Sequence, residues 1–356
     1  MRRLTAAGVL MTLAGVALFV WLVWWVGPAE IWAGFRQIGW GLAVIIALAG
    51  LRFALRAAAW IRCLEPPHTL RLSDAFAAVV SGDALGNLTP LGPIVGEPAK
   101  AAFVRPHVPL GAALTALAIE NVLYTLSVAA MIAAGTIALL LHANLDEPVR
   151  EAGLIAIAGV FALYVVVVWL LWRRPAILSR ALAALRPRAA PGKWSARIAK
   201  VQALERDIYT FASRRRAALA PLVAMELGFH ALGVLEVHVT LWLLLGAPPP
   251  LLTSFILETV NRLINVVFKI VPLQVGVNEA GSALTTSILG LGTTPGLTLG
   301  IVRKARMLFW MVLGTGLLIR HGLSARRVLE DAELGGGQLH QTSTPVVPSP
   351  TEPGRR

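Results

Sequence analysis

The chain has 356 residues, of which 56% are hydrophobic and only 14% are charged, and its mean hydropathy is +0.71. Soluble domains carry about a quarter charged residues, so this composition excludes an ordinary soluble enzyme and predicts a polytopic membrane protein. The net charge of +13 does not indicate a nucleic-acid partner, because twelve Lys and Arg residues lie in one segment, 173–216, with two acids and no basic recognition motif.

Six apolar segments are long enough to cross about 30 Å of hydrocarbon. They are 5–27, 40–62, 109–141, 152–172, 217–245 and 296–319. Arg2 and Arg3 precede the first segment, and the basic loop 173–216 follows the fourth. Positively charged loops stay inside, so both termini are expected in the cytoplasm and the protein in the cytoplasmic (inner) cell membrane.

Two stretches, 73–106 and 251–294, are interrupted by Pro and Gly and do not fit simple spans. The sides on which the flanking spans end require each stretch to begin and end on the same side of the membrane. The stretch 73–106 begins and ends inside, and the stretch 251–294 begins and ends outside. Both re-entrant hairpins and pairs of short spans satisfy this requirement. We therefore expect an all-α integral membrane helical bundle of six full spans plus two inverted, Pro/Gly-broken hairpins, roughly eight transmembrane helices in total.

This bundle is expected to form one domain, 1–327, within which the basic loop contains an amphipathic helix near 194–211. The segment 328–356 is rich in Gly, Pro, Ser and Thr and is expected to be a disordered cytoplasmic tail.

The stretch "TPLGPIVGEPAKAAFVR", residues 89–105, is the first candidate site. Irregular backbone at membrane depth must be buried in protein or line water. The Glu97-Pro98 pair predicts a helix that begins there, after Gly96, and whose first N–H groups bind an anion with help from Lys100. Asn87 ends the preceding apolar segment. The alternative is a cytoplasmic linker with ordinary snorkelling cations.

A second stretch, "VPLQVGVNEAGSAL", repeats the pattern with Pro272, Gly276, Asn278 and Glu279. Asn278 is a predicted N-cap for a helix that starts at Glu279. Broken helices that enter from opposite sides and meet near the midplane are a recurring feature of transporters.

Charged residues within apolar segments form the remaining candidates, because a charge deep in a bilayer costs about 2.5–3.5 kcal/mol and usually faces the protein interior. Glu258, Arg262, Asn265 and Lys269 share one helical face. An alternative is that Glu258 and Arg262 only neutralise each other. Near the start of the last span, at least one of the cations Arg303, Lys304 and Arg306 is expected to point inward.

The paired elements "NLTPLGPIVGEPAKAAFVR" and "VPLQVGVNEAGSAL…GIVRKARMLFW" resemble the flippase-like transmembrane region of bacterial lysylphosphatidylglycerol synthases, over about residues 5–320. The same region occurs in stand-alone membrane proteins. In this chain Leu273-Gln274-Val275 stands where the family often has adjacent glycines. No soluble aminoacyl-transferase domain is expected after Arg327, so lysyl transfer by this chain is not expected.

The resemblance implies a bundle that moves, or helps to assemble, lipids with anionic or polyprenyl-phosphate headgroups. We expect the two half-helix N-termini to hold the headgroup phosphate, with Lys100, Arg262 and Lys269 neutralising it. The alternatives are a secondary transporter of a small polar or anionic solute and a non-catalytic membrane partner of a lipid or glycan synthase. No nucleophile elbow, phosphate-binding loop or dinucleotide fingerprint is present, so we expect no enzymatic activity, cofactor or bound metal.

The expected binding residues are Asn87, Gly96, Glu97, Lys100, Glu258, Arg262, Asn265, Lys269, Gly276, Asn278, Glu279 and Arg303.

Overall fold

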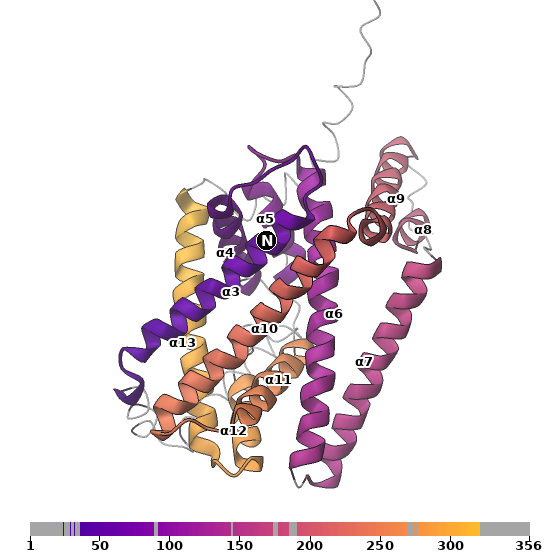
Figure 1. Cartoon of the computed structure of the whole chain (residues 1–356). Coiled ribbons are helices and arrows are strands. Elements are labelled where there is room, and N and C mark those ends of the chain that lie inside the picture. Colours follow the sequence, from indigo (N-terminus) through magenta and orange to yellow (C-terminus); the bar gives the residue numbers. More distant parts are fainter. Residues whose placement is uncertain are drawn as a thin grey trace, which may run out of the picture.

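A computed structural model describes residues 24, 29, 32, 36–88, 92–143, 145–173, 177–184, 191–268, 274 and 276–320. The elements in this part of the chain are helices, as predicted for an all-α membrane bundle (Figure 1). They are α3 (Gly41–Cys63), α4 (Leu72–Leu88), α5 (Gly92–Phe103), α6 (Leu110–His142), α7 (Glu147–Arg173), α8 (Ile177–Ala184), α9 (Pro191–Arg214), α10 (Arg216–Leu245), α11 (Leu251–Val267), α12 (Val277–Ile288) and α13 (Thr293–Arg320).

Four of these helices are long and apolar enough to cross a membrane: α3, α6, α7 and α10. They coincide with four of the predicted spans. The 28 residues of α13 also match a predicted span, although its middle carries Arg303, Lys304 and Arg306. The predicted first span, 5–27, and the predicted tail lie outside the described residues apart from Trp24.

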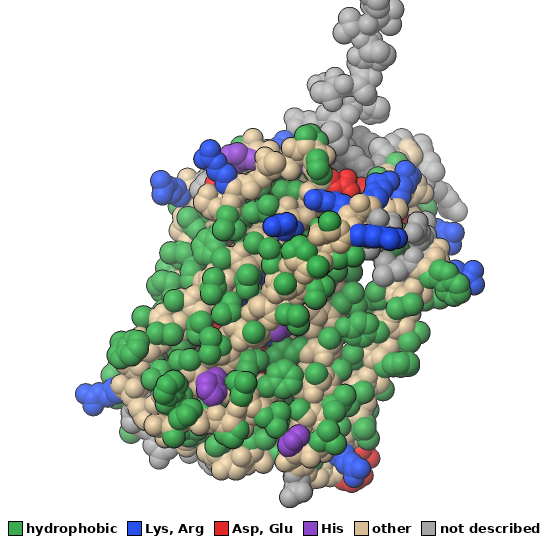
Figure 2. Space-filling model, in the orientation of Figure 1, with side chains coloured by type: hydrophobic (Ala, Val, Ile, Leu, Met, Phe, Trp, Pro, Cys, Tyr) green, Lys and Arg blue, Asp and Glu red, His purple; other side chains and the backbone are tan. Residues whose placement is uncertain are grey.

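Apolar side chains cover the outside of the bundle, as expected for a surface in contact with lipid. In Figure 2 they occupy the middle of the visible face, and Lys and Arg side chains gather toward the end that carries α8 and α9. On α7, Ile155 is 72% exposed and Phe161 is 71% exposed. A soluble protein rarely exposes so continuous an apolar surface. The helix α9 covers the amphipathic segment predicted in the basic loop.

The same succession of helices occurs twice. A long helix, α3, is followed by α4 with 17 residues, α5 with 12 residues and the long α6. In the second half α10 is followed by α11 with 17 residues, α12 with 12 residues and the long α13. The halves exchange contacts, because α4 packs on α13, α11 packs on α6, and α3 packs on α10.

The two short pairs lie at opposite ends of the bundle, in agreement with the predicted inverted hairpins (Figure 1). At 1.5 Å per residue, a helix of 12 residues spans only about 18 Å, and the hydrocarbon is about 30 Å thick. Neither α5 nor α12 is long enough to cross alone, so the helix lengths favour re-entrant hairpins over pairs of full spans.

Glycines let each hairpin pack closely. A Cβ atom on Gly96 of α5 would lie 2.8 Å from the carbonyl oxygen of Gly82 on α4. In the second half, a Cβ atom on Gly281 of α12 would overlap the side chain of Ile264 on α11. Small residues of this kind allow helix backbones to approach within a membrane, where hydrophobic burial gives no driving force between helices.

Candidate functional site

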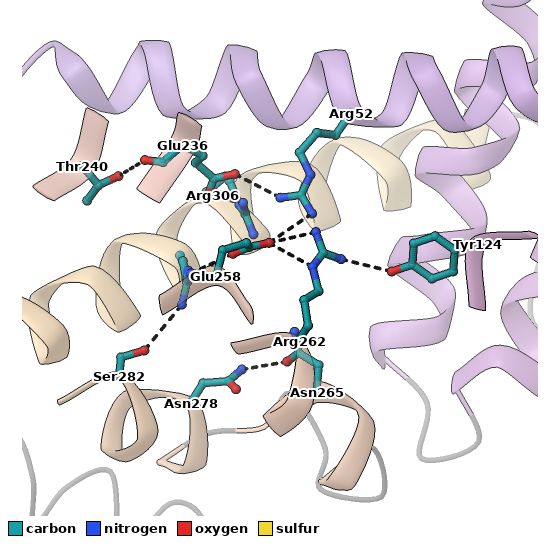
Figure 3. Close-up of polar contacts among 11 residues, drawn as sticks. Arg52, Tyr124, Glu236, Thr240, Glu258, Arg262, Asn265, Asn278, Ser282 and Arg306 are labelled. Carbon is teal, nitrogen blue, oxygen red and sulfur yellow. Dashed lines mark hydrogen bonds and ion pairs between the residues drawn. The ribbon is translucent and has the colours of Figure 1, made fainter. Parts of the chain in front are cut away.

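A buried carboxylate, Glu258 of α11, lies at the centre of the bundle and is shared by several arginines (Figure 3). Its Oε1 atom lies 2.9 Å from Nε of Arg262, one helical turn away. Its Oε2 atom accepts a hydrogen bond of 2.9 Å from Nη2 of Arg303 on α13. Arg52 of α3 approaches the same carboxylate to 3.9 Å. The expected Glu258–Arg262 pair is present, and the same carboxylate also bonds Arg303.

A second buried carboxylate, Glu236 of α10, continues this network. It accepts a hydrogen bond of 3.2 Å from Nη1 of Arg52 and another from Arg306 on α13. Glu236 was not identified from the sequence. The sequence feature that could have identified Glu236 is its place as the single acid in the apolar run "GVLEVHVTLWLLL".

These six residues, which we call the central cluster, are Arg52, Glu236, Glu258, Arg262, Arg303 and Arg306. They contain four guanidinium groups and two carboxylates, which gives 4 − 2 = +2. Glu258 and Glu236 are each 2% exposed, and Arg262 is 5% exposed. Charges removed from water are costly unless they are paired, so a positive excess in this position favours the binding of an anion.

Three other embedded cations in the described part of the chain each have a neighbouring carboxylate. Arg56 bonds Glu120 at 2.8 Å, Lys100 bonds Glu97 at 2.7 Å, and Lys304 lies 3.9 Å from Glu279. The positive excess is therefore a property of the central cluster rather than of every embedded cation.

Aromatic side chains support the cluster. The hydroxyl of Tyr124 on α6 accepts a hydrogen bond of 3.1 Å from Nη1 of Arg262. The ring of Phe229 on α10 lies 4.5 Å from the guanidinium carbon of Arg52 and 5.0 Å from that of Arg262. Arg56 stacks 3.9 Å above the ring of Tyr124. Cation–π contacts of this kind stabilise arginines that have left water.

The predicted residues Asn265 and Asn278 bond each other instead of a charged group of the cluster. Nδ2 of Asn278 donates to Oδ1 of Asn265 at 3.3 Å and to Oε1 of Gln274 at 3.0 Å. Nε2 of Gln274 donates to the carbonyl of Asn265 at 3.2 Å. These bonds tie the end of α11 to the start of α12. Lys269 and Pro272, which the sequence also indicated, lie outside the described residues.

The predicted N-cap of the second half-helix is wrong. The helix α12 begins at Val277 and its N-cap is Gly276, at a positive φ of 83°, rather than Asn278. Glu279 is the third residue of the helix and accepts a hydrogen bond of 2.8 Å from the backbone N–H of Gly276. This fully buried carboxylate thus occupies the helix N-terminus, where an external anion was expected, and satisfies the N–H of Gly276.

The predicted start of the first half-helix is also wrong. The helix α5 begins at Gly92, with Pro98 inside it, so the expected anion site at Glu97-Pro98 is not a helix N-terminus. An earlier proline, Pro93, occupies the first turn, where a missing N–H costs nothing. Glu97 and Lys100 bond each other.

The remaining residues predicted on this hairpin also have local roles. Asn87 donates to Asp83 at 3.0 Å, and Gly96 provides the close contact with α4. Of the twelve predicted binding residues, the structure brings Glu258, Arg262 and Arg303 together in the central cluster.

The comparisons with known proteins agree with this architecture. The family model described as "Lysylphosphatidylglycerol synthase TM region" matches residues 12–316. The comparisons with curated proteins and with solved structures found no match.

Proposed function

The chain belongs to the family of the lysylphosphatidylglycerol synthase TM region, membrane proteins associated with lipid modification or transport, and from this premise we propose that it binds an amphiphilic lipid with an anionic or polyprenyl-phosphate headgroup and moves it across the cytoplasmic membrane. In this proposal the headgroup phosphate binds at the central cluster while the acyl or prenyl chains stay in the bilayer. The basic loop 173–216 and both termini lie in the cytoplasm.

The observation that carries the proposal is the positive excess of the central cluster. Guanidinium groups bind phosphate oxygens in a planar, bidentate manner, and four of them converge here from three helices. The side chains of Arg52 and Arg306 are 14% and 20% exposed, whereas that of Arg262 is 6% exposed. Arg52 and Arg306 are therefore the members that an arriving headgroup meets first.

The inverted hairpins provide the movement in this proposal. The pair α4–α5 and the pair α11–α12 approach the middle of the bundle from opposite ends. Rocking of one half against the other exposes a central anion site to each side in turn, which is the usual consequence of inverted repeats.

Reconstitution in vesicles tests the proposal. Purified protein is placed in phosphatidylcholine vesicles that contain a trace of labelled phosphatidylglycerol, polyprenyl phosphate or labelled phosphatidylcholine, and the transfer of each label between leaflets is measured. We expect transfer of at least one anionic lipid and slower transfer of phosphatidylcholine.

The matched variants are Arg306→Gln in the cluster and Arg320→Gln at the exposed end of the same helix. Loss of one charged hydrogen bond weakens binding by about tenfold, so R306Q is expected to lower transfer and R320Q to leave it unchanged. Equal transfer of anionic and neutral lipids, or no loss with R306Q, contradicts the proposal. Binding without transfer favours a non-catalytic partner of a synthase, and uptake of water-soluble phosphate alone favours a solute carrier.

A further inference from the structure

A serine, a glutamate and a histidine meet beside the central cluster. Oγ of Ser127 on α6 lies 3.0 Å from Oε2 of Glu226 and 2.9 Å from Nε2 of His230, both on α10. Glu226 is 7% exposed and His230 is 8% exposed. This contact is not visible in the sequence, because Ser127 lies about one hundred positions from Glu226 and His230.

The single hydrogen of the Ser127 hydroxyl limits which hydrogen bonds can form at this position. Its oxygen also lies 2.8 Å from the carbonyl oxygen of Tyr124, so three groups surround a hydroxyl that has only one hydrogen. A carbonyl only accepts, and a hydroxyl donates once and accepts up to twice. When Ser127 donates to Tyr124, Glu226 can bond the same oxygen only if it carries a proton. When Ser127 donates to Glu226, the carboxylate needs no proton of its own to form this bond.

We propose that Glu226, Ser127 and His230 form a proton-binding site whose occupancy is linked to the anion in the central cluster; this inference rests on the proposed function. In the proton-poor state Glu226 is a carboxylate, Ser127 donates to it, and the Nε2–H group of His230 donates to Ser127. In the proton-rich state Glu226 is a neutral acid that donates to Ser127, and Ser127 donates to the unprotonated Nε2 atom of His230.

The histidine provides a nitrogen atom for the incoming proton. Its Nδ1 atom is buried and has no hydrogen-bond partner among the described residues. A proton that arrives at Nδ1 releases the Nε2 proton to Ser127, as the serine passes its own proton to Glu226. One proton has then been added, Glu226 is neutral, and the imidazole is again neutral with its hydrogen on Nδ1.

The link to the central cluster runs through Tyr124. The ring of His230 lies parallel to that of Tyr124, with 6.4 Å between ring centroids, and the Tyr124 hydroxyl bonds Arg262. The charged and titratable groups that act on Glu226 and His230 are Arg52 and Arg56 on α3, Glu120 and Tyr124 on α6, and Glu258 and Arg262 on α11.

The sign of the link follows from the cluster charge. An unoccupied cluster has an excess of cations, and their field opposes the arrival of another positive charge. A bound anion offsets this field, so binding of the headgroup favours uptake of the proton. By reciprocity, lower pH strengthens anion binding.

Binding measurements at several pH values test the link. Short-chain phosphatidylglycerol is titrated into the purified full-length protein in a neutral detergent, and the heat is measured in two buffers with different ionisation enthalpies. For wild type we expect uptake of a fraction of a proton per lipid. The Kd is expected to decrease as the pH is lowered, by up to about tenfold per pH unit, which is the limit for one linked proton.

Two variants and a matched control separate the site from general effects on folding. Glu226→Gln is expected to bind the lipid without proton uptake and with a flatter pH dependence, and Ser127→Ala is expected to shift the pH at which the uptake occurs. Ser81→Ala on α4 removes another buried serine hydroxyl, one without a hydrogen-bond partner among the described residues, and is expected to behave as wild type. Proton uptake that is the same in wild type, E226Q and S127A overturns the inference.

A second measurement needs no lipid. Infrared difference spectra between acid and neutral pH are expected to show a protonated carboxyl band that disappears in E226Q and titrates at a different pH in S127A. Unchanged spectra in both variants overturn the proton site. A wild-type protein that shows this band but does not bind phosphatidylglycerol contradicts the proposed lipid instead, so the two failures are distinguishable.

Discussion

Gly233 on α10 lies directly against Glu258 on α11: a Cβ atom at Gly233 would be 2.7 Å from Oε1 of that carboxylate and 3.3 Å from Nη2 of Arg262. The absence of a side chain at this position lets the shared carboxylate reach the interface between the two helices. A glycine in the apolar run of α10 is thus part of the structure of the central cluster.

Gly233→Ala is therefore expected to displace Glu258 and Arg262 and to lower stability by about 1–3 kcal/mol, as overpacking does in tight interiors. Anionic lipid binding is expected to weaken at the same time. The control is Gly228→Ala on the same helix, where the nearest atom to the new Cβ is a flexible Leu55 methyl at 3.3 Å. Thermal unfolding and lipid titration of both variants check this prediction, which is contradicted if the two variants behave alike.

Glu258→Gln is expected to lower the stability of the protein more than a double substitution that keeps the net charge of the central cluster. The single variant raises the excess of the central cluster from two positive charges to three, since Arg262 and Arg303 lose their shared carboxylate. Removal of one partner of a buried ion pair costs about 3–5 kcal/mol. The double variant Glu258→Gln/Arg262→Gln restores the original excess.

A double-mutant cycle with Arg262→Gln measures this effect. We expect a coupling free energy of about 1–3 kcal/mol between the two positions, from chemical or thermal unfolding in detergent. Losses of stability that simply add contradict this prediction, because they mean that Glu258 and Arg262 do not stabilise each other.

Much of the fold follows from local properties of the sequence. The spans are predictable because the length of an apolar segment must match the bilayer, and Glu258 with Arg262 is predictable because residues four apart share a helical face. Glu236 could not be assigned, because its partners come from α3 and α13 and depend on how the helices cross. No pattern within α10 contains that information.

The helix starts were mispredicted for a different reason. Both Pro93 and Pro98 are compatible with a first turn, and the structure uses the earlier one although Pro98 then lacks an N–H within the helix. Close packing of Gly96 on Gly82 stabilises the longer helix, and this contact between helices is not visible in the spacing of the prolines.

Glu279 is expected to be a structural cap rather than a ligand for the headgroup. In Glu279→Ala the buried N–H of Gly276 loses its acceptor, which costs about 1–3 kcal/mol, and Lys304 loses a neighbouring carboxylate. Glu279→Gln keeps an acceptor for the N–H and is expected to lie between wild type and E279A in stability. Hydrogen exchange at the start of α12 should increase in the same order; faster exchange throughout the protein, without a local effect, speaks against the capping role.

The hairpin topology predicts where introduced cysteines react. The single native cysteine, Cys63, is buried, and Cys63→Ala provides a background without thiols. Single cysteines at Arg71 and His107, on either side of α4–α5, are expected to react with an impermeant maleimide from the cytoplasmic side only. Cysteines at Ala247 and Thr293, on either side of α11–α12, should react from outside, because each re-entrant pair returns to the side from which it entered. Labelling of intact and permeabilised cells decides this, and labelling of Arg71→Cys and His107→Cys from opposite sides means that α4 and α5 together cross the membrane an odd number of times.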